Sequence, residues 1–133
     1  MPEKILIVDD EPDIQVYLEA ALEDSGYAVR LLGQEEPFLE TVVAEQPSLI
    51  CLDILMPRRS GLSLFKSLQE DPTLRRIPVL LISGITKARA LLEQDAEPDA
   101  QRERGGVAVL EKPIQIPELL QTVEALLAPK ETP

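Results

Sequence analysis

Short aliphatic runs alternate along the chain with segments of helical periodicity, and this alternation most constrains the fold. The runs are continuous in hydrophobicity, which is typical of strands buried on both faces of a sheet. They cover residues 5–8, 49–52, 79–82 and 107–110, and a weaker fifth run at 28–32 is interrupted by Arg30. Between them, apolar residues recur at spacings of three and four, as on one face of a helix. The clearest such stripe consists of Ile14, Tyr17, Leu18, Ala21 and Leu22.

Further helices are predicted around residues 38–43, 62–68 and 119–127. Because strands and helices alternate with short connections, we predict an α/β fold with a parallel sheet and helices on both faces. The segment 93–104 differs, since five carboxylates and two arginines leave it almost nothing to bury. A single helix over 86–104 would have to accommodate Pro98 at a cost of about 3 kcal/mol, so we predict a break there.

Composition narrows the class of protein. The 133 residues favour one domain, predicted to cover residues 1–128, with 129–133 as a tail or linker stub. The net charge of −11 opposes direct binding to nucleic acid or to an anionic membrane. The chain has no histidine, so it cannot itself be a phosphohistidine donor. Its single cysteine, Cys51, excludes an internal disulfide and is interpreted as a small core residue.

Two observations bear on location. No apolar run approaches the roughly 20 residues needed to span a bilayer. The run at residues 5–8 is too short for the core of a signal peptide. We therefore expect a protein of the reducing cytoplasm, compatible with its one cysteine.

Polar side chains follow four of the five predicted strands. They are Asp9, Asp10, Asp53, Ser83 and Lys112. In open α/β sheets, ligands bind at the carboxyl ends of the strands, where these residues would meet. A single aspartate there is more often the cap of a helix or turn, but capping requires neither a serine nor a lysine. We predict that the five form one site.

Three carboxylates at one edge must take up protons or hold a cation. Oxygen ligands without histidine or thiolate favour Mg²⁺ or Mn²⁺, which commonly also contacts a phosphoryl oxygen. An aspartate can be the nucleophile of phosphoryl transfer and form an acyl phosphate. A lysine and a hydroxyl would then stabilise the transferring group, so the residues indicate phosphoryl transfer.

In order and position, these residues resemble the receiver domain of two-component response regulators, the CheY-like family. The resemblance rests on Asp9-Asp10, the run DILMPRRSG from Asp53 to Gly61, Ser83-Gly84 and Lys112-Pro113, and it covers most of the chain. It implies a doubly wound, flavodoxin-like sheet of five parallel strands in the order 2-1-3-4-5, flanked by five helices.

The resemblance also implies a role for each residue. Asp53 would be the phosphoacceptor. Asp10, Asp53 and the carbonyl of Leu55 would be Mg²⁺ ligands, with Asp9 acting largely through water. Ser83 would contact the phosphoryl group.

Lys112 would face the phosphate and precede a cis peptide at Pro113. The implied donor is a sensor histidine kinase or a phosphotransfer protein, and the phosphorylated domain would act on a downstream protein. The resemblance implies a signalling domain, monomeric or dimerising on phosphorylation, and not an enzyme in the ordinary sense.

Several positions depart from the family pattern. Val109 stands where receivers usually carry an aromatic ring that reports phosphorylation. Gly84 follows the serine, and the stretch 83–105 is longer than usual. The residues expected beside the attacking water are Leu55 and Ile85, which cannot hydrogen-bond it, so we predict slow self-dephosphorylation.

Three other functions are possible for a chain with these residues. A phosphohydrolase of the haloacid-dehalogenase kind needs a second aspartate two residues after the nucleophile, where this chain has Leu55. A phosphate-independent interaction module is favoured by Val109 and opposed by the acidic residues and Lys112. Flavin binding is opposed by Asp9, Asp10 and Glu11, whose charges would repel its phosphate. The pairs Arg58-Arg59 and Arg75-Arg76 are interpreted as solvated surface, and the alternative for Arg58 and Arg59, which are near the site in sequence, is contact with an acidic face of a partner.

Overall fold

The computed structural model describes residues 3–33, 35–54, 56, 59–84 and 106–128. Its strands are β1 (Lys4–Val8), β2 (Ala28–Leu31), β3 (Leu49–Asp53), β4 (Val79–Ser83) and β5 (Val107–Glu111). Its helices are α1 (Pro12–Asp24), α2 (Phe38–Glu45), α3 (Gly61–Glu70), the short 3₁₀ helix η1 (Leu74–Arg76) and α6 (Ile116–Leu127). The helix break predicted at Pro98 lies outside the described residues.

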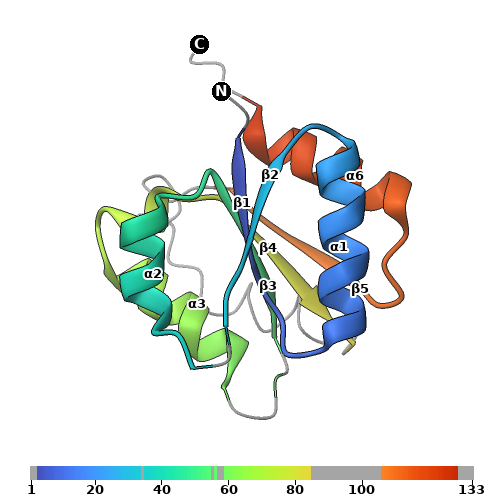
Figure 1. Cartoon of the computed structure of the whole chain (residues 1–133). Helices are drawn as coiled ribbons and strands as arrows, with labels where there is room; N and C mark the ends of the chain where they lie inside the picture. The colour runs from blue at the N-terminus through green and yellow to red at the C-terminus, as the bar shows by residue number, and fades with distance from the viewer. Residues whose placement is uncertain (1–2, 34, 55, 57–58, 85–105, 129–133) are drawn as a thin grey trace.

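All five strands are parallel and lie in the order β2-β1-β3-β4-β5, as the resemblance implied. Helices α1 and α6 cover one face of the sheet, and α2 and α3 cover the other (Figure 1). Because the strands run in one direction, their carboxyl ends share one edge, which is the lower edge in Figure 1. The predicted α/β class and the helices on both faces are confirmed.

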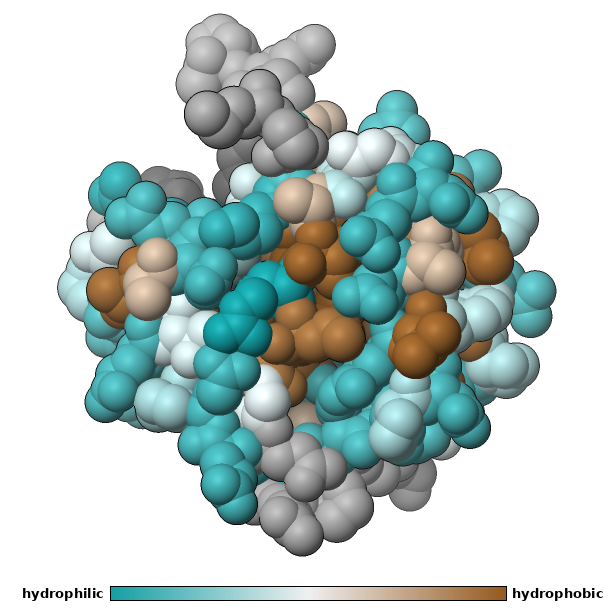
Figure 2. Space-filling view, viewed as in Figure 1, coloured by the Kyte–Doolittle hydropathy of each residue, from teal (hydrophilic) through white to brown (hydrophobic). Residues whose placement is uncertain are grey.

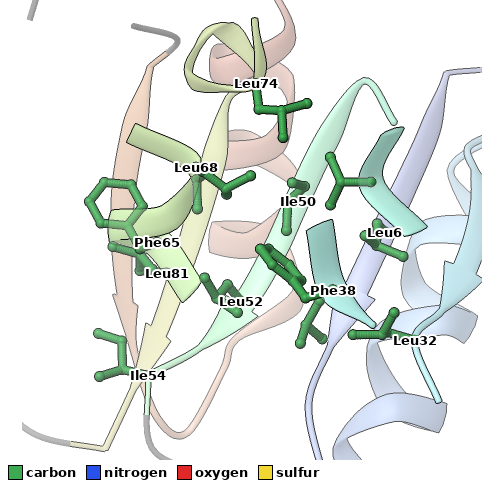
Figure 3. Close-up of a cluster of buried hydrophobic side chains, with 13 residues drawn as sticks. Leu6, Leu32, Phe38, Ile50, Leu52, Ile54, Phe65, Leu68, Leu74 and Leu81 are labelled. Atoms are coloured by element: carbon green, nitrogen blue, oxygen red, sulfur yellow. The ribbon is translucent and has the colours of Figure 1, made fainter. Parts of the chain in front are cut away.

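Alternate residues of the central strands supply two separate cores. Leu6, Ile50 and Leu52 pack under α2 and α3 with Phe38 and Phe65 (Figure 3). The intervening residues of the same strands face α1 and α6 instead. This division explains the continuous aliphatic runs, since both faces of each central strand are buried.

Cys51 belongs to the core beneath α1 and α6. Its side chain is buried, and burial raises the pKa of the thiol to about 12. The thiol therefore stays protonated and packs as a small apolar group, as the sequence indicated.

Strand β2 forms one border of the sheet, and all four of its residues are only half-buried. Figure 2 shows hydrophobic side chains gathered at the centre of the face that β2 crosses in Figure 1, with hydrophilic side chains around them. The weaker strand signal of residues 28–32 follows from this position, since a border strand needs fewer aliphatic side chains.

Candidate functional site

Four of the predicted site residues meet at the carboxyl edge of the sheet. Asp9 follows β1 directly, Asp53 ends β3, Ser83 ends β4 and Lys112 follows β5. The backbone N–H of Lys112 donates to the carbonyl of Ser83 at 2.9 Å, which holds the ends of β4 and β5 side by side. Asp9, Asp53 and Ser83 are all buried, with at most 2% of each residue exposed.

Lys112 joins two of the carboxylates. Its Nζ lies 3.4 Å from Oδ2 of Asp53 and 3.1 Å from Oε1 of Glu11. Burial by itself would lower the pKa of Lys112. The hydrogen bond to Glu11 and the charges of Asp53 and Asp9 outweigh that effect and raise the pKa. The ammonium group is therefore charged at neutral pH and lies beside the predicted phosphoacceptor.

Among the described residues, one oxygen of the Asp9 carboxylate has a hydrogen-bond partner and the other has none. Its Oδ1 accepts the backbone N–H of Glu11 at 2.8 Å, whereas its Oδ2 is buried and has no hydrogen-bond partner among the described residues. Burial raises the pKa of Asp9 to about 6, and the charge of Asp53 adds to the rise. A buried carboxylate with an unsatisfied oxygen is costly unless a cation or a proton joins it.

The carboxylates fit a metal ion. One oxygen from each of Asp9, Glu11 and Asp53 lies within 4.8 Å of the other two. Carboxylate oxygens are the ligands that Mg²⁺ and Mn²⁺ prefer, and the free oxygen of Asp9 supplies an unused ligand atom. The sequence interpretation overlooked Glu11, although its position directly after the aspartate pair could have indicated it.

Asp10 is not a member of this group of three. It pairs with Arg59, whose Nη2 is 3.6 Å from Oδ1 of Asp10, and its Oδ2 is buried without a hydrogen-bond partner among the described residues. The prediction that Asp10 is a direct metal ligand therefore stays a prediction. The interpretation of Arg59 as solvated surface is wrong, since only 17% of its side chain is exposed.

The start of α3 is packed closely against the backbone at the end of β3. A Cβ atom added at Gly61 would lie 2.0 Å from the carbonyl oxygen of Asp53. The N–H of Gly61 donates to the carbonyl of Ile54 at 2.9 Å, and the N–H of Ile54 donates to that of Ile82 at 2.9 Å. The first residue of α3 is thereby fixed against the end of β3. Leu55 lies outside the described residues.

The predicted cis peptide between Lys112 and Pro113 is confirmed. Val109, in the place of the usual aromatic ring, is half-buried and packs against the core beneath α2 and α3.

A model of the response regulator receiver domain family matches residues 5–124 of the chain. Together with the strand order and the site, this match shows that the chain belongs to the receiver domain family of two-component systems. Its members are signalling domains that interact with histidine kinases or phosphotransfer proteins.

The chain is 32% identical over 127 residues to the response regulator MprA of Mycolicibacterium vanbaalenii, covering 96% of this chain and 51% of that protein. It therefore spans about half the length of that relative. It is 28% identical over 127 residues to the polar-differentiation response regulator DivK of Brucella anthropi, covering 96% of this chain and 98% of that protein.

Among solved structures, the fold is similar to the receiver domain of a signal transduction histidine kinase from Syntrophus aciditrophicus. The TM-score is 0.75 at 30% identity, with 94% of this chain and 89% of that chain covered. The chemotaxis protein CheY4 of Vibrio cholerae shares the fold, with a TM-score of 0.77 at 23% identity over 96% of this chain and all of that chain. Among the described residues, no helix has the length and hydrophobicity to cross a membrane.

Proposed function

We propose that Asp53 accepts a phosphoryl group from a phosphohistidine of a sensor kinase or phosphotransfer protein, with a divalent cation bound beside it. The observation that carries this proposal is the contact of 3.4 Å between the charged Nζ of Lys112 and the buried carboxylate of Asp53. A carboxylate that only stabilised the fold would not need two further carboxylate oxygens within 4.8 Å.

The reaction follows from the groups at the site. An oxygen of Asp53 attacks phosphorus, the new O–P bond gives an acyl phosphate, and the N–P bond of the donor breaks. The imidazole keeps the electron pair of that bond and takes up a proton. The ammonium group of Lys112 stabilises negative charge on the transferring phosphoryl oxygens, and Ser83, buried at the end of β4, supplies a hydroxyl at the same edge.

Asp9 and Asp53, with Glu11 close by, are the described residues that could hold the cation. The family resemblance adds Asp10 and the carbonyl of Leu55. Bound there, Mg²⁺ or Mn²⁺ would neutralise charge on the phosphoryl oxygens.

Replacement of the phosphoacceptor tests the proposal. Incubated with Mg²⁺ and phosphoramidate or acetyl phosphate, the wild-type protein should gain the mass of one phosphoryl group, and Asp53→Asn should gain none. Asp24→Asn is the matched control, because it makes the same chemical change at an exposed residue ending α1. Equal labelling of the Asp53→Asn variant would sink the assignment.

We further propose that the phosphorylated state is long-lived, because Leu55 and Ile85 offer no polar group to orient a hydrolytic water. Both residues lie outside the described part of the chain, so this proposal rests on the sequence alone. The variant carrying Leu55→Asn and Ile85→Glu should lose its phosphoryl group faster than wild type once the donor is removed. Rapid decay in the wild type, unaltered in the variant, would contradict the proposal.

We propose that the phosphorylated domain acts on a downstream protein, either as a monomer or as a dimer that forms on phosphorylation. Its donor would be an intracellular kinase domain or phosphotransfer protein, and we accordingly place its action in the cytoplasm.

A further inference from the structure

Asp9, Asp10, Glu11 and Asp53 are carboxylates at the carboxyl edge of the sheet, which we call the acidic edge. Arg59 is enclosed between this acidic edge and the connection from β2 to α2. Its Nη2 lies 3.6 Å from Oδ1 of Asp10 and 3.5 Å from the carbonyl oxygen of Gly33. Its Nη1 lies 3.4 Å from the carbonyl oxygen of Glu36. With 17% of its side chain exposed, Arg59 has exchanged most of its contact with water for these three oxygens.

All three contacts are long. Charge-assisted hydrogen bonds between nitrogen and oxygen are typically about 2.7–2.9 Å, so the attraction between Arg59 and Asp10 is Coulombic without a short hydrogen bond. Among the described residues, Nε of Arg59 and Oδ2 of Asp10 are also buried without a hydrogen-bond partner. If Arg59 only stabilised the fold, we would expect its Nε and the Oδ2 of Asp10 to have hydrogen-bond partners, because buried polar atoms usually do. The pair therefore neutralises charge while leaving ligand atoms of Asp10 unused.

Away from Asp10, the guanidinium group of Arg59 contacts the turn of Gly33 and Glu36, which several hydrogen bonds stabilise. The N–H of Glu36 donates to the carbonyl of Gly33 at 3.2 Å, and the carboxylate of Glu36 accepts the N–H of Gly33 at 2.7 Å. The same carboxylate accepts both terminal nitrogens of Arg30, at 3.0 and 2.6 Å. Arg59 thus connects a carboxylate of the acidic edge with a turn that is anchored to strand β2.

We infer that Arg59 is a positioning residue that forms an ion pair with Asp10 in the metal-free protein and competes with a divalent cation for this carboxylate. When the cation binds Asp10, Arg59 loses its ion pair and keeps its contacts to the carbonyls of Gly33 and Glu36. Metal binding therefore changes the environment of that turn. This inference rests on the proposed function in one respect, namely that a divalent cation binds at the acidic edge with Asp10 among its ligands.

The charges of these residues agree with such a competition. Four carboxylates, those of Asp9, Asp10, Glu11 and Asp53, gather at this edge with the two cationic groups of Lys112 and Arg59. Among these described residues two negative charges remain, which one divalent cation would neutralise. Removing Arg59 would leave three, and the attraction for the cation would rise.

The test compares Mg²⁺ affinities at fixed ionic strength by calorimetric titration. Arg59→Met should bind Mg²⁺ more tightly than wild type, on the order of five- to ten-fold, since one positive charge near the site is lost. Arg76→Met removes the same charge from an exposed residue at the opposite edge of the sheet and should stay within about two-fold of wild type. Arg59→Lys keeps the charge and should stay close to wild type. Arg59→Gln serves as a second neutral variant should Arg59→Met fold poorly.

A second readout separates competition from a merely structural role. In the wild type, Mg²⁺ should shift the backbone amide resonances of Gly33 and Glu36, and in Arg59→Met this response should be lost. Equal Mg²⁺ affinity in Arg59→Met, Arg59→Gln and wild type would overturn the inference, as would weaker binding in both neutral variants.

Failure of the inference can be told from failure of the proposed function. If all variants bind Mg²⁺ equally and Asp53 is still phosphorylated, only the role of Arg59 is refuted. If neither the wild type nor any Arg59 variant binds Mg²⁺, the metal site and the inference fall together.

Discussion

The two ends of the sheet hold ion pairs of the same chemical types in opposite settings. At the amino edge, Nζ of Lys4 lies 3.0 Å from Oε1 of Glu45, and Nε of Arg30 lies 3.5 Å from Oε2 of the same carboxylate. These side chains are 27–40% exposed. At the carboxyl edge, Asp9 and Asp53 are 2% exposed, and one oxygen of Asp9 has no hydrogen-bond partner among the described residues.

The pKa values of Glu45 and Asp9 are therefore shifted in opposite directions. The hydrogen bond from Lys4 lowers the pKa of Glu45, whereas burial raises the pKa of Asp9 to about 6. Exposed pairs such as those of Glu45 cost little and contribute little to stability. A buried carboxylate with an unsatisfied oxygen, such as that of Asp9, destabilises the fold. It lies where phosphoryl transfer would require it, whereas Lys4, Arg30 and Glu45 pair their charges near water.

The largest effect that we expect is a loss of stability when a methyl group is added to a glycine at the carboxyl edge, compared with the same change at the amino edge. Gly61→Ala should destabilise the protein by at least about 3 kcal/mol, because the new Cβ would lie 2.0 Å from the backbone of Asp53. Gly26, at the amino edge, has a φ of +94° but open space around its Cα. Gly26→Ala should cost only about 1–2 kcal/mol of backbone strain. Urea unfolding measures both, and equal losses would contradict the close approach at Gly61.

The next effect is the change in stability when a carboxylate is neutralised, which should have opposite signs at the two edges. In the absence of divalent cations, Asp9→Asn should stabilise the protein by about 1–2 kcal/mol at pH 7.5, because a buried carboxylate with a raised pKa disfavours folding when ionised. Glu45→Gln should slightly lower stability instead, because it breaks two exposed ion pairs. Thermal unfolding in chelator checks both variants, and destabilisation by Asp9→Asn would remove the difference between the edges.

The smallest effect is a pH dependence at the β2–α2 turn. The hydrogen bonds from Arg30 and from the N–H of Gly33 lower the pKa of Glu36 to about 2, against an ordinary value of 4.5. Because the folded pKa is depressed, the stability it contributes is present above pH 4.5 and is lost as the pH falls toward 2. The Tm difference between wild type and Glu36→Gln should therefore shrink over that range. Glu124→Gln, on the exposed face of α6, is the control for losing one surface charge.

The elements of the fold could be predicted where burial acts on both faces of a strand. The run predicted at residues 49–52 is strand β3, Leu49–Asp53, and the run at 79–82 is strand β4, Val79–Ser83. Continuous aliphatic runs specify buried parallel strands almost by themselves. The order of the strands came from the family resemblance, because no local pattern encodes which strands are neighbours.

The candidate site could be predicted where a residue directly follows a strand. Asp9, Asp53, Ser83 and Lys112 meet because parallel strands end at one edge. Arg59 could not be predicted in this way, since its burial depends on contacts with Asp10 and with the turn at Glu36, which are distant in sequence. An arginine in a loop is usually solvated, and Arg59 becomes enclosed only through these contacts in the folded protein.

The most direct test of the difference between the two edges is the thermal stability of the protein with and without Mg²⁺ at matched ionic strength. If the carboxyl edge holds buried carboxylates that bind a cation, Mg²⁺ at about ten times its Kd should stabilise the wild type by about 1.4 kcal/mol, or roughly 4–6 °C in Tm. Glu45→Gln should show the same gain, and Asp9→Asn, already more stable without the metal, should gain clearly less. An unchanged Tm in the wild type, or equal gains in all three proteins, would contradict the account.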